Sequence, residues 1–157
     1  MIELKKGSLT LFFGTGDFKQ KDFNVIETLC KESKVDLFKL PETNRHPKNQ
    51  RKYALLIARL INQEITCAVI THSDYFVKEI NILIMLNGSS KHAEKVRKQY
   101  NYDLEVLLPA DKVKAYVICN GKFFPCEVNS ELGIEAVSFD DVINEMNRIQ
   151  EAILFGD

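Results

Sequence analysis

Two short stretches carry side chains that could contact a phosphate or move a proton. The apolar run 65-ITCAVIT-71 is followed by His72 and Ser73, and a second apolar run, 35–40, precedes the polar loop and helix start 44-NRHPKNQ-50. An imidazole titrates near neutral pH and suits phosphate sensing, whereas a serine after a strand can cap a helix. His72 and Ser73 are therefore candidate phosphate contacts. The alternative that the sequence leaves open is a polar His72 at a strand end, satisfied by backbone or water.

The histidines do not have the spacing of a metal site. His46, His72 and His92 lie far apart, and no carboxylate or thiol follows any of them at i+3 or i+4 in the pattern of a zinc site. We therefore expect no bound metal.

A nucleotide site of the P-loop kind requires the pattern G-x-x-x-x-G-K-[S/T], in which backbone N–H groups and the lysine converge on the phosphates. The chain contains no such pattern. The glycines of 14-GTGD-17 are two residues apart, so this stretch is predicted to be a turn. We expect no cofactor, and the sequence leaves weak binding of ATP open.

Hydrophobic periodicity alternates between strands and helices along the first 90 residues. Pro47 suits the first turn of a helix, Ser73 can cap the next one, and Asn87-Gly88 should end the last apolar run. The pattern predicts strands at 8–13, 35–40, 66–71 and 82–86, and helices at 22–33, 48–63 and 74–81.

The last third of the chain has a different character. Asn120-Gly121 between 113–119 and 122–128 is a strong hairpin signal, and Pro125 confines the second strand to a sheet edge. The stretch 138-SFDD-141 resembles a capping box that opens a C-terminal helix. The apolar face of that helix would contain Phe139, Val142, Ile143, Met146, Ile149 and Ile153.

These elements predict an α/β protein with a mostly parallel sheet flanked by helices, to which a β-hairpin and a C-terminal helix are added. The strands 35–40, 66–71 and 82–86 should be neighbours in that sheet. The loop 41–47 and His72 should then share the carboxyl edge, where open α/β sheets gather their ligands.

The order of three segments resembles the C-terminal half of ABC-type AAA ATPases, the group that contains the overcoming-lysogenisation-defect ATPases. The segments are 35-VDLFKLPETNRHPKNQRKYALLIARL-60, 69-VITHSDYFVKEINILIMLN-87 and 138-SFDDVINEMN-147. In that family a Walker B strand precedes a loop with L-H-P-x-x-Q, and a later strand ends in T-H-S. The resemblance implies a half domain like that of P-loop NTPases, in which His72 would be the switch histidine facing the terminal phosphate of ATP.

Two carboxylates of the family pattern are replaced. The resemblance places Lys39 where a magnesium-associated aspartate belongs and Leu40 where the catalytic glutamate belongs. An ammonium about 4 Å from a magnesium site repels the metal ion, and leucine cannot orient a water. Lys39 could pair with Glu42 and keep the loop folded, or it could be a solvated lysine at a strand end.

The resemblance covers about residues 34 to 155, so the chain is read as one truncated domain, 1–157. Residues 1–33 form a non-matching N-terminal segment, 34–88 run from the Walker B-like strand to the switch histidine, and 89–157 form the C-terminal hairpin and helix.

The overall composition is that of a globular protein. The net charge is −1, with 21 basic and 22 acidic residues, so neither a nucleic acid nor a membrane is an expected partner. The basic runs 48-KNQRK-52 and 91-KHAEKVRKQY-100 could touch phosphates, or they could be solvated helix faces. The four cysteines lie in apolar surroundings without C-x-x-C spacing, so we expect buried thiols and a cytoplasmic location: Cys30, Cys67, Cys119 and Cys126.

The missing nucleotide machinery leads to the hypothesis of a non-catalytic, truncated ABC-type ATPase-like protein that acts as an interaction or regulatory module. Its partner would be a second copy of itself or a full-length ATPase. Two alternatives stay open: a subunit that completes an ATPase site in trans with a partner carrying a P-loop, and a decayed ATPase fragment.

Overall fold

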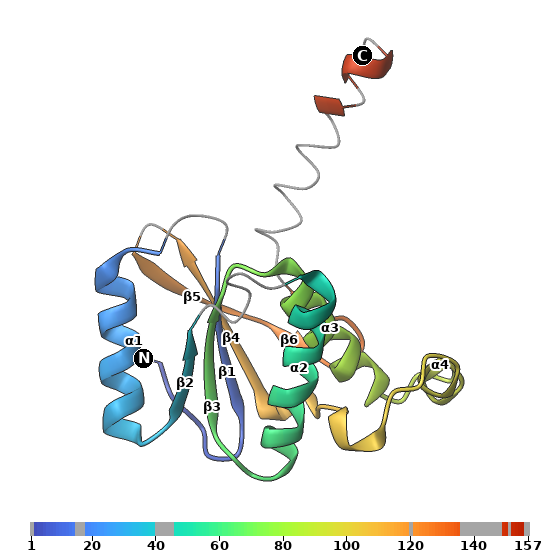
Figure 1. The fold of residues 1–157 in the computed structure, drawn as a ribbon, viewed down its shortest axis with the longest axis horizontal. Helices are drawn as coiled ribbons and strands as arrows, with labels where there is room; N and C mark the ends of the chain where they lie inside the picture. The colour runs from blue at the N-terminus through green and yellow to red at the C-terminus, as the bar shows by residue number, and fades with distance from the viewer. Residues whose placement is uncertain are drawn as a thin grey trace.

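The protein is built around a five-stranded sheet, as seen in a computed structural model that describes residues 2–14, 18–39, 46–119, 121–135, 149–150 and 152–155 (Figure 1). The strand order is β2-β3-β1-β4-β5, and β5 alone runs antiparallel to its neighbour. The predicted α/β class with a mostly parallel sheet is therefore confirmed. The strands are β1 (Leu9–Phe13), β2 (Asp36–Lys39), β3 (Cys67–Thr71), β4 (Val113–Cys119) and β5 (Lys122–Cys126).

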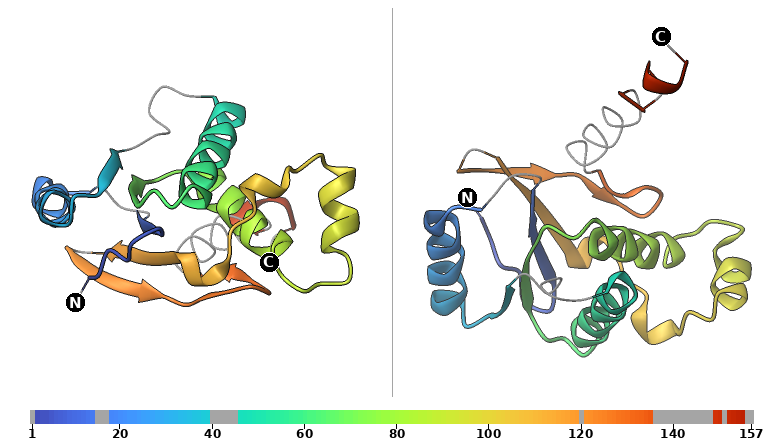
Figure 2. Two further views of the ribbon diagram at one scale, coloured as in Figure 1. Left: turned by 90° about the horizontal axis from the view of Figure 1, so that it is seen from below. Right: turned by 45° about the horizontal axis from the view of Figure 1, so that its top comes forward.

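Helices cover both faces of this sheet. Helix α1 (Gln20–Ser33) lies on one face, and α2 (Pro47–Asn62) and α3 (Asp74–Leu86) lie on the other, while α4 (Ala93–Gln99) lies outside α3 at the far end from α1 (Figures 1 and 2). The predicted helices at 22–33 and 48–63 are thus confirmed, with Pro47 at the start of α2.

Alternation along the strands explains why both faces are covered. Leu9, Leu11 and Phe13 point from β1 into the core shared with α2 and α3, whereas Phe12 points into the core under α1. All five residues of β1 and of β3 are buried, as expected for parallel strands between two helical layers.

The prediction of a strand at 82–86 is wrong, because these residues continue α3 to Leu86. A short apolar run does not by its periodicity separate a buried strand from a buried helix. Burial shows the helical period: Leu83 and Ile84 are buried in succession, whereas Ile82 and Met85 are exposed. The predicted end of the run is confirmed, since Asn87 caps the helix.

The first 33 residues supply the centre of the sheet. Strand β1 pairs with β3 on one side and with β4 on the other, so the segment outside the family resemblance forms the middle of the domain.

Within the described part of the chain, no helix is both long enough and apolar enough to cross a bilayer.

The predicted hairpin is confirmed as β4 and β5, with β5 at the edge of the sheet. It is followed by a two-stranded sheet of β6 (Val128–Asn129) and β7 (Gly133–Ile134), and β7 packs on α3. Short 3₁₀ turns, η1 (Leu104–Val106) and η2 (Ala110–Lys112), lead into β4. The predicted helix from 138 falls mostly outside the described residues.

Candidate functional site at the carboxyl edge of the sheet

The chain leaves the sheet in opposite directions after the neighbouring strands β1 and β3. The chain after β1 leads to α1 on one face, and the chain after β3 leads to α3 on the other. Such a divergence at the carboxyl ends of adjacent parallel strands is where open α/β sheets usually bind ligands. Gly14 and His72, which directly follow β1 and β3, flank this point.

The imidazole of His72 spans the divergence point. Its Nδ1 lies 3.0 Å from the carbonyl oxygen of Gly14, and because a carbonyl only accepts hydrogen bonds, Nδ1 must be the donor. The Phe18 ring stacks on the imidazole, with centroids 3.8 Å apart and planes at 18°. His72 therefore joins the segments that follow β1 and β3.

Gly14 has a steric reason to be glycine. A Cβ atom there would lie 2.6 Å from the carbonyl oxygen of Ile118 in β4, closer than real Cβ atoms come to backbone. The absence of a side chain lets the chain after β1 pass close to β4 and present its carbonyl to His72. Residues 15–17 of the predicted turn lie outside the described part of the chain.

Ser73 caps α3, as predicted. Its hydroxyl oxygen accepts a hydrogen bond from the N–H of Phe76 at 3.0 Å, and the hydroxyl donates to Oε1 of Gln50 in the first turn of α2. The side chain of Thr71 accepts from the Ser73 N–H at 2.9 Å. These bonds hold the N-termini of α2 and α3 together at the carboxyl edge.

His46 also has a local structural role. It is the N-cap residue of α2, and its Nδ1 accepts a hydrogen bond from the N–H of Lys48 at 3.2 Å. Because α2 begins at the edge where β2 and β3 end, His46 and His72 share that edge, as predicted. His92 precedes α4 and is exposed. Among the described residues, no group of three His, Cys, Asp or Glu side chains could hold a metal ion.

Lys39, the residue at the aspartate position of the resemblance, ends β2 and forms an ion pair with Glu27 of α1. This hydrogen bond to the ammonium lowers the pKa of the Glu27 carboxyl. Lys39 is therefore directed to the α1 side of the sheet. Leu40 and Glu42 lie outside the described residues.

The expectation of four buried cysteines is wrong at one position. Cys30 and Cys67 are buried and Cys126 is half-buried, but Cys119 at the end of β4 is exposed. Burial raises the pKa of both Cys30 and Cys67 to about 11. The strand ends at Cys119, as the sequence predicted, but the apolar neighbours of this residue did not reveal that it is exposed there.

Sequence reasoning missed the contacts of Phe18 with His72 and of Gln50 with Ser73, because these contacts join segments far apart in the chain. It also missed a buried carboxylate, Glu79, which could have been found. In a single helix over 74–86, Glu79 falls on the apolar face between Phe76 and Leu83. The incorrect strand at 82–86 concealed that pattern.

No protein-family model, curated protein or solved structure matches the chain.

Proposed function

We propose that this chain is a non-catalytic module that works by association with a protein partner, built on an α/β scaffold like one half of an ABC-type ATPase. The partner would be a second copy of the chain or a full-length ATPase of that kind. The proposal concerns two properties, the absence of nucleotide turnover and the presence of a docking surface.

The observation that carries the first property is the position of His72. Its ring is stacked on Phe18 and hydrogen-bonded to Gly14 at the point where an α/β sheet would receive its ligand. A histidine held in this way serves the joining of β1 and β3. The ion pair of Lys39 with Glu27 supports the same reading, because the resemblance calls for a magnesium-binding carboxylate at this position and the chain has a lysine there whose ammonium is held at α1.

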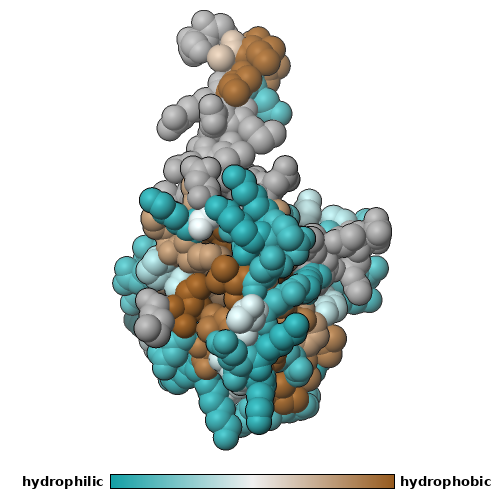
Figure 3. Space-filling model, turned by 90° about the vertical axis from the view of Figure 1, so that its left-hand side faces the viewer, coloured by the Kyte–Doolittle hydropathy of each residue, from teal (hydrophilic) through white to brown (hydrophobic). Residues whose placement is uncertain are grey.

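The second property is supported by the outer face of α1. Hydrophobic residues lie among hydrophilic ones on this face of the molecule (Figure 3). A shallow hollow there is lined by Ile2, Val25 and Leu29, and Val25 is 51% exposed. Protein interfaces usually have an apolar centre that is surrounded by a polar rim.

Sedimentation velocity across micromolar concentrations, combined with identification of proteins retained from the native host, tests the association. We expect either self-association or retention of an ATPase. The Val25→Glu variant should abolish it because a charge would enter the interface. The matched control is Leu104→Glu, which changes a leucine that is 69% exposed on the opposite side of the sheet. A chain that is monomeric throughout and retains no ATPase would contradict the proposal.

A second candidate function is a subunit that completes an ATPase site in trans. It is favoured by the meeting of the α2 and α3 N-termini with His72 at one edge, because helix N-termini attract phosphate. In that case a P-loop partner should gain ATPase activity on addition of this chain, and His72→Ala should remove the gain. A non-catalytic module leaves the activity independent of His72.

A further inference from the structure

We propose that a cavity between α2, α3 and α4 binds a small aromatic phosphate monoester, such as a nucleoside monophosphate. Neither Gly14, His72 nor Ser73 lines this cavity, and its function does not depend on the association proposed above. The cavity encloses 610 Å³, which lies within the range of roughly 300–1,000 Å³ common for small-molecule sites. Its lining is Lys48, Arg51, Lys52 and Leu55 of α2, Glu79 and Ile82 of α3, Val96 of α4, and Tyr100, Asn101 and Tyr102 after α4.

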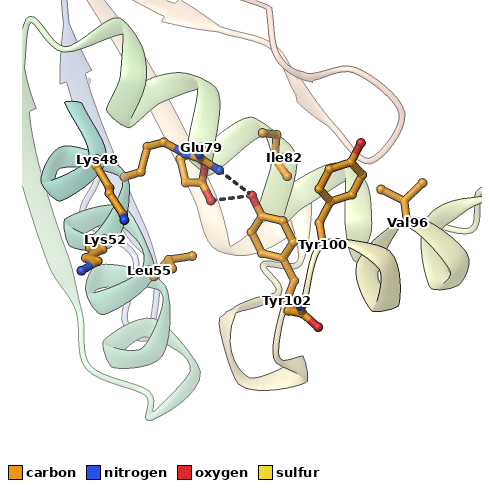
Figure 4. Close-up of a pocket in the computed structure, with 10 residues that line it drawn as sticks. Lys48, Lys52, Leu55, Glu79, Ile82, Val96, Tyr100 and Tyr102 are labelled. Carbon is orange, nitrogen blue, oxygen red and sulfur yellow. Dashed lines mark hydrogen bonds and ion pairs between the residues drawn. The ribbon is translucent and has the colours of Figure 1, made fainter.

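A buried network fixes one wall of the cavity. The carboxylate of Glu79, whose side chain is 2% exposed, accepts hydrogen bonds from Nε of Arg51 at 2.8 Å and from the hydroxyl of Tyr102 at 2.7 Å. Nη2 of Arg51 also lies 3.2 Å from the Tyr102 hydroxyl oxygen. Figure 4 shows this hydroxyl directed toward Glu79 (Figure 4). The network joins three segments that are distant in sequence and leaves the Arg51 side chain 53% exposed.

The lining carries an excess of positive charge. The lining contains one carboxylate, that of Glu79, and three basic side chains, those of Lys48, Arg51 and Lys52. No ion pair joins either lysine to another described residue. Two positive charges therefore remain without a partner in the lining. A phosphate monoester carries a charge of about −1.5 to −2 near neutral pH and would balance them.

The placement of these cations is unfavourable for the helix by itself. They lie at i, i+3 and i+4 in the first turns of α2, where like charges repel each other and the helix dipole favours anions. The first turn of α2 contains no acidic residue. An anion bound in the cavity would remove both penalties, which explains why the sequence places the basic run 48–52 there.

The other end of the cavity suits a flat apolar group. Tyr100 is 64% exposed, and Ile82 and Val96 lie beside it, so their apolar surface faces the cavity. Figure 4 shows Tyr100 and Val96 on the side away from Lys48 and Lys52. A ring stacked on Tyr100 would cover this surface while its phosphate reaches the lysines. Stacking of a nucleobase on an aromatic side chain contributes about 1–3 kcal/mol.

The basic runs of α2 and α4 thus acquire different roles. The run 48–52 supplies the cations of the site. The run 91–100 contributes Val96 and Tyr100, and none of its lysines lines the cavity. Lys98, for example, pairs with Glu94 on the surface of α4. Charge alone would have assigned both runs the same role.

Isothermal titration calorimetry with adenosine monophosphate, adenosine and inorganic phosphate tests the site. We expect adenosine monophosphate to bind with a dissociation constant in or below the millimolar range, more tightly than either of its halves, and to bind more weakly as salt is added. Equal binding of adenosine would overturn the charge argument, and equal binding of phosphate would overturn the stacking argument. No binding of adenosine monophosphate at millimolar concentration would overturn the proposal.

Matched variants locate the binding. The double variant Lys48→Gln, Lys52→Gln should weaken the binding of adenosine monophosphate by roughly tenfold or more, because charge-assisted hydrogen bonds are lost. The control is Lys95→Gln, which changes an exposed lysine of α4 outside the lining. Comparable weakening by the control would show a general effect of surface charge and contradict the assigned site.

The aromatic contact has its own pair of variants. Tyr100→Ala should weaken the binding of adenosine monophosphate by about 5- to 150-fold and leave the weak binding of inorganic phosphate unchanged. The control is Tyr75→Ala, since Tyr75 is a similarly exposed tyrosine of α3 outside the cavity. Unchanged affinity in Tyr100→Ala, in a variant that keeps the circular dichroism of the wild type, would contradict the stacking role.

Discussion

At the scale of single residues, the carboxylate of Glu79 depends on partners from two other segments. Removal of Arg51 would leave this buried charge with only the Tyr102 hydroxyl as a partner. Breaking a fully buried ion pair costs about 3–5 kcal/mol, but half of the Arg51 side chain is exposed and water can replace part of the bond. We expect Arg51→Ala to lower the free energy of unfolding by about 1–3 kcal/mol, measured by urea denaturation.

The matched control is Lys52→Ala, which removes a neighbouring cation that forms no ion pair with the described residues and should change stability by less than about 0.5 kcal/mol. Equal effects of the two substitutions would show that Glu79 gains nothing from Arg51. Glu79→Gln in the Arg51→Ala background should restore part of the lost stability, because the unpaired charge is then removed.

The thiols should differ in reactivity by position. Cys119 is exposed, whereas burial raises the pKa of Cys30 and Cys67 to about 11, so that only about one in a thousand of these thiols is ionised at pH 8. We expect a disulfide reagent to label Cys119 rapidly in the native protein, and Cys30 and Cys67 only after unfolding. Cys119→Ser should remove the fast phase. Labelling of Cys30 or Cys67 at the rate of Cys119 would contradict the burial of these residues.

At the scale of elements, substitutions can test that α3 continues to Leu86. In the helix, Leu83 and Ile84 are both buried and Met85 is 43% exposed, whereas a strand would place Leu83 and Met85 on the same face. We expect Leu83→Ala and Ile84→Ala each to cost about 2–5 kcal/mol, and Met85→Ala less than about 1 kcal/mol. Similar costs for Leu83→Ala and Met85→Ala, with a small cost for Ile84→Ala, would favour the strand.

The start of α3 gives a second test at this scale. Ser73→Ala removes the hydroxyl that accepts from the Phe76 N–H and donates to Gln50, so it should cost about 1 kcal/mol. Ser73→Asp, which keeps an acceptor for the helix N–H, should cost less. Ser89→Ala, at an exposed serine beyond the helix, is the neutral control. A neutral Ser73→Ala variant would contradict the capping role.

The elements differ in how well their sequences predict them. Strand β3 and helix α2 were predictable because a continuous β-branched run and an apolar face at helical spacing each have one physical explanation. The run 82-ILIML-86 is compatible with both a buried strand and a buried helix, and packing decides between them. Helix α3 contacts both α2 and β7, so its apolar positions face more than one neighbour. Local sequence does not contain that information.

At the scale of the whole molecule, the sequence predicted which residues reach the carboxyl edge and the capping role of Ser73, but not most of the contacts that these residues make there. The succession of strands was enough to place His46 and His72 on one edge. The stacking of Phe18 on His72 depends on β1 lying beside β3, and the cavity depends on Arg51, Glu79 and Tyr102 meeting across about 50 residues. Such meetings follow from the order of strands in the sheet, which hydrophobic periodicity does not determine.

The proposed absence of nucleotide turnover can be tested by the release of phosphate from ATP in the presence of magnesium. We expect the purified chain to release phosphate no faster than its His72→Ala variant, whose circular dichroism should confirm that it is folded. Lys39→Asp with Leu40→Glu should also stay inactive, because no phosphate-binding glycine loop is encoded in the sequence. Magnesium-dependent release of phosphate by the wild type that His72→Ala abolishes would show that the chain is an ATPase.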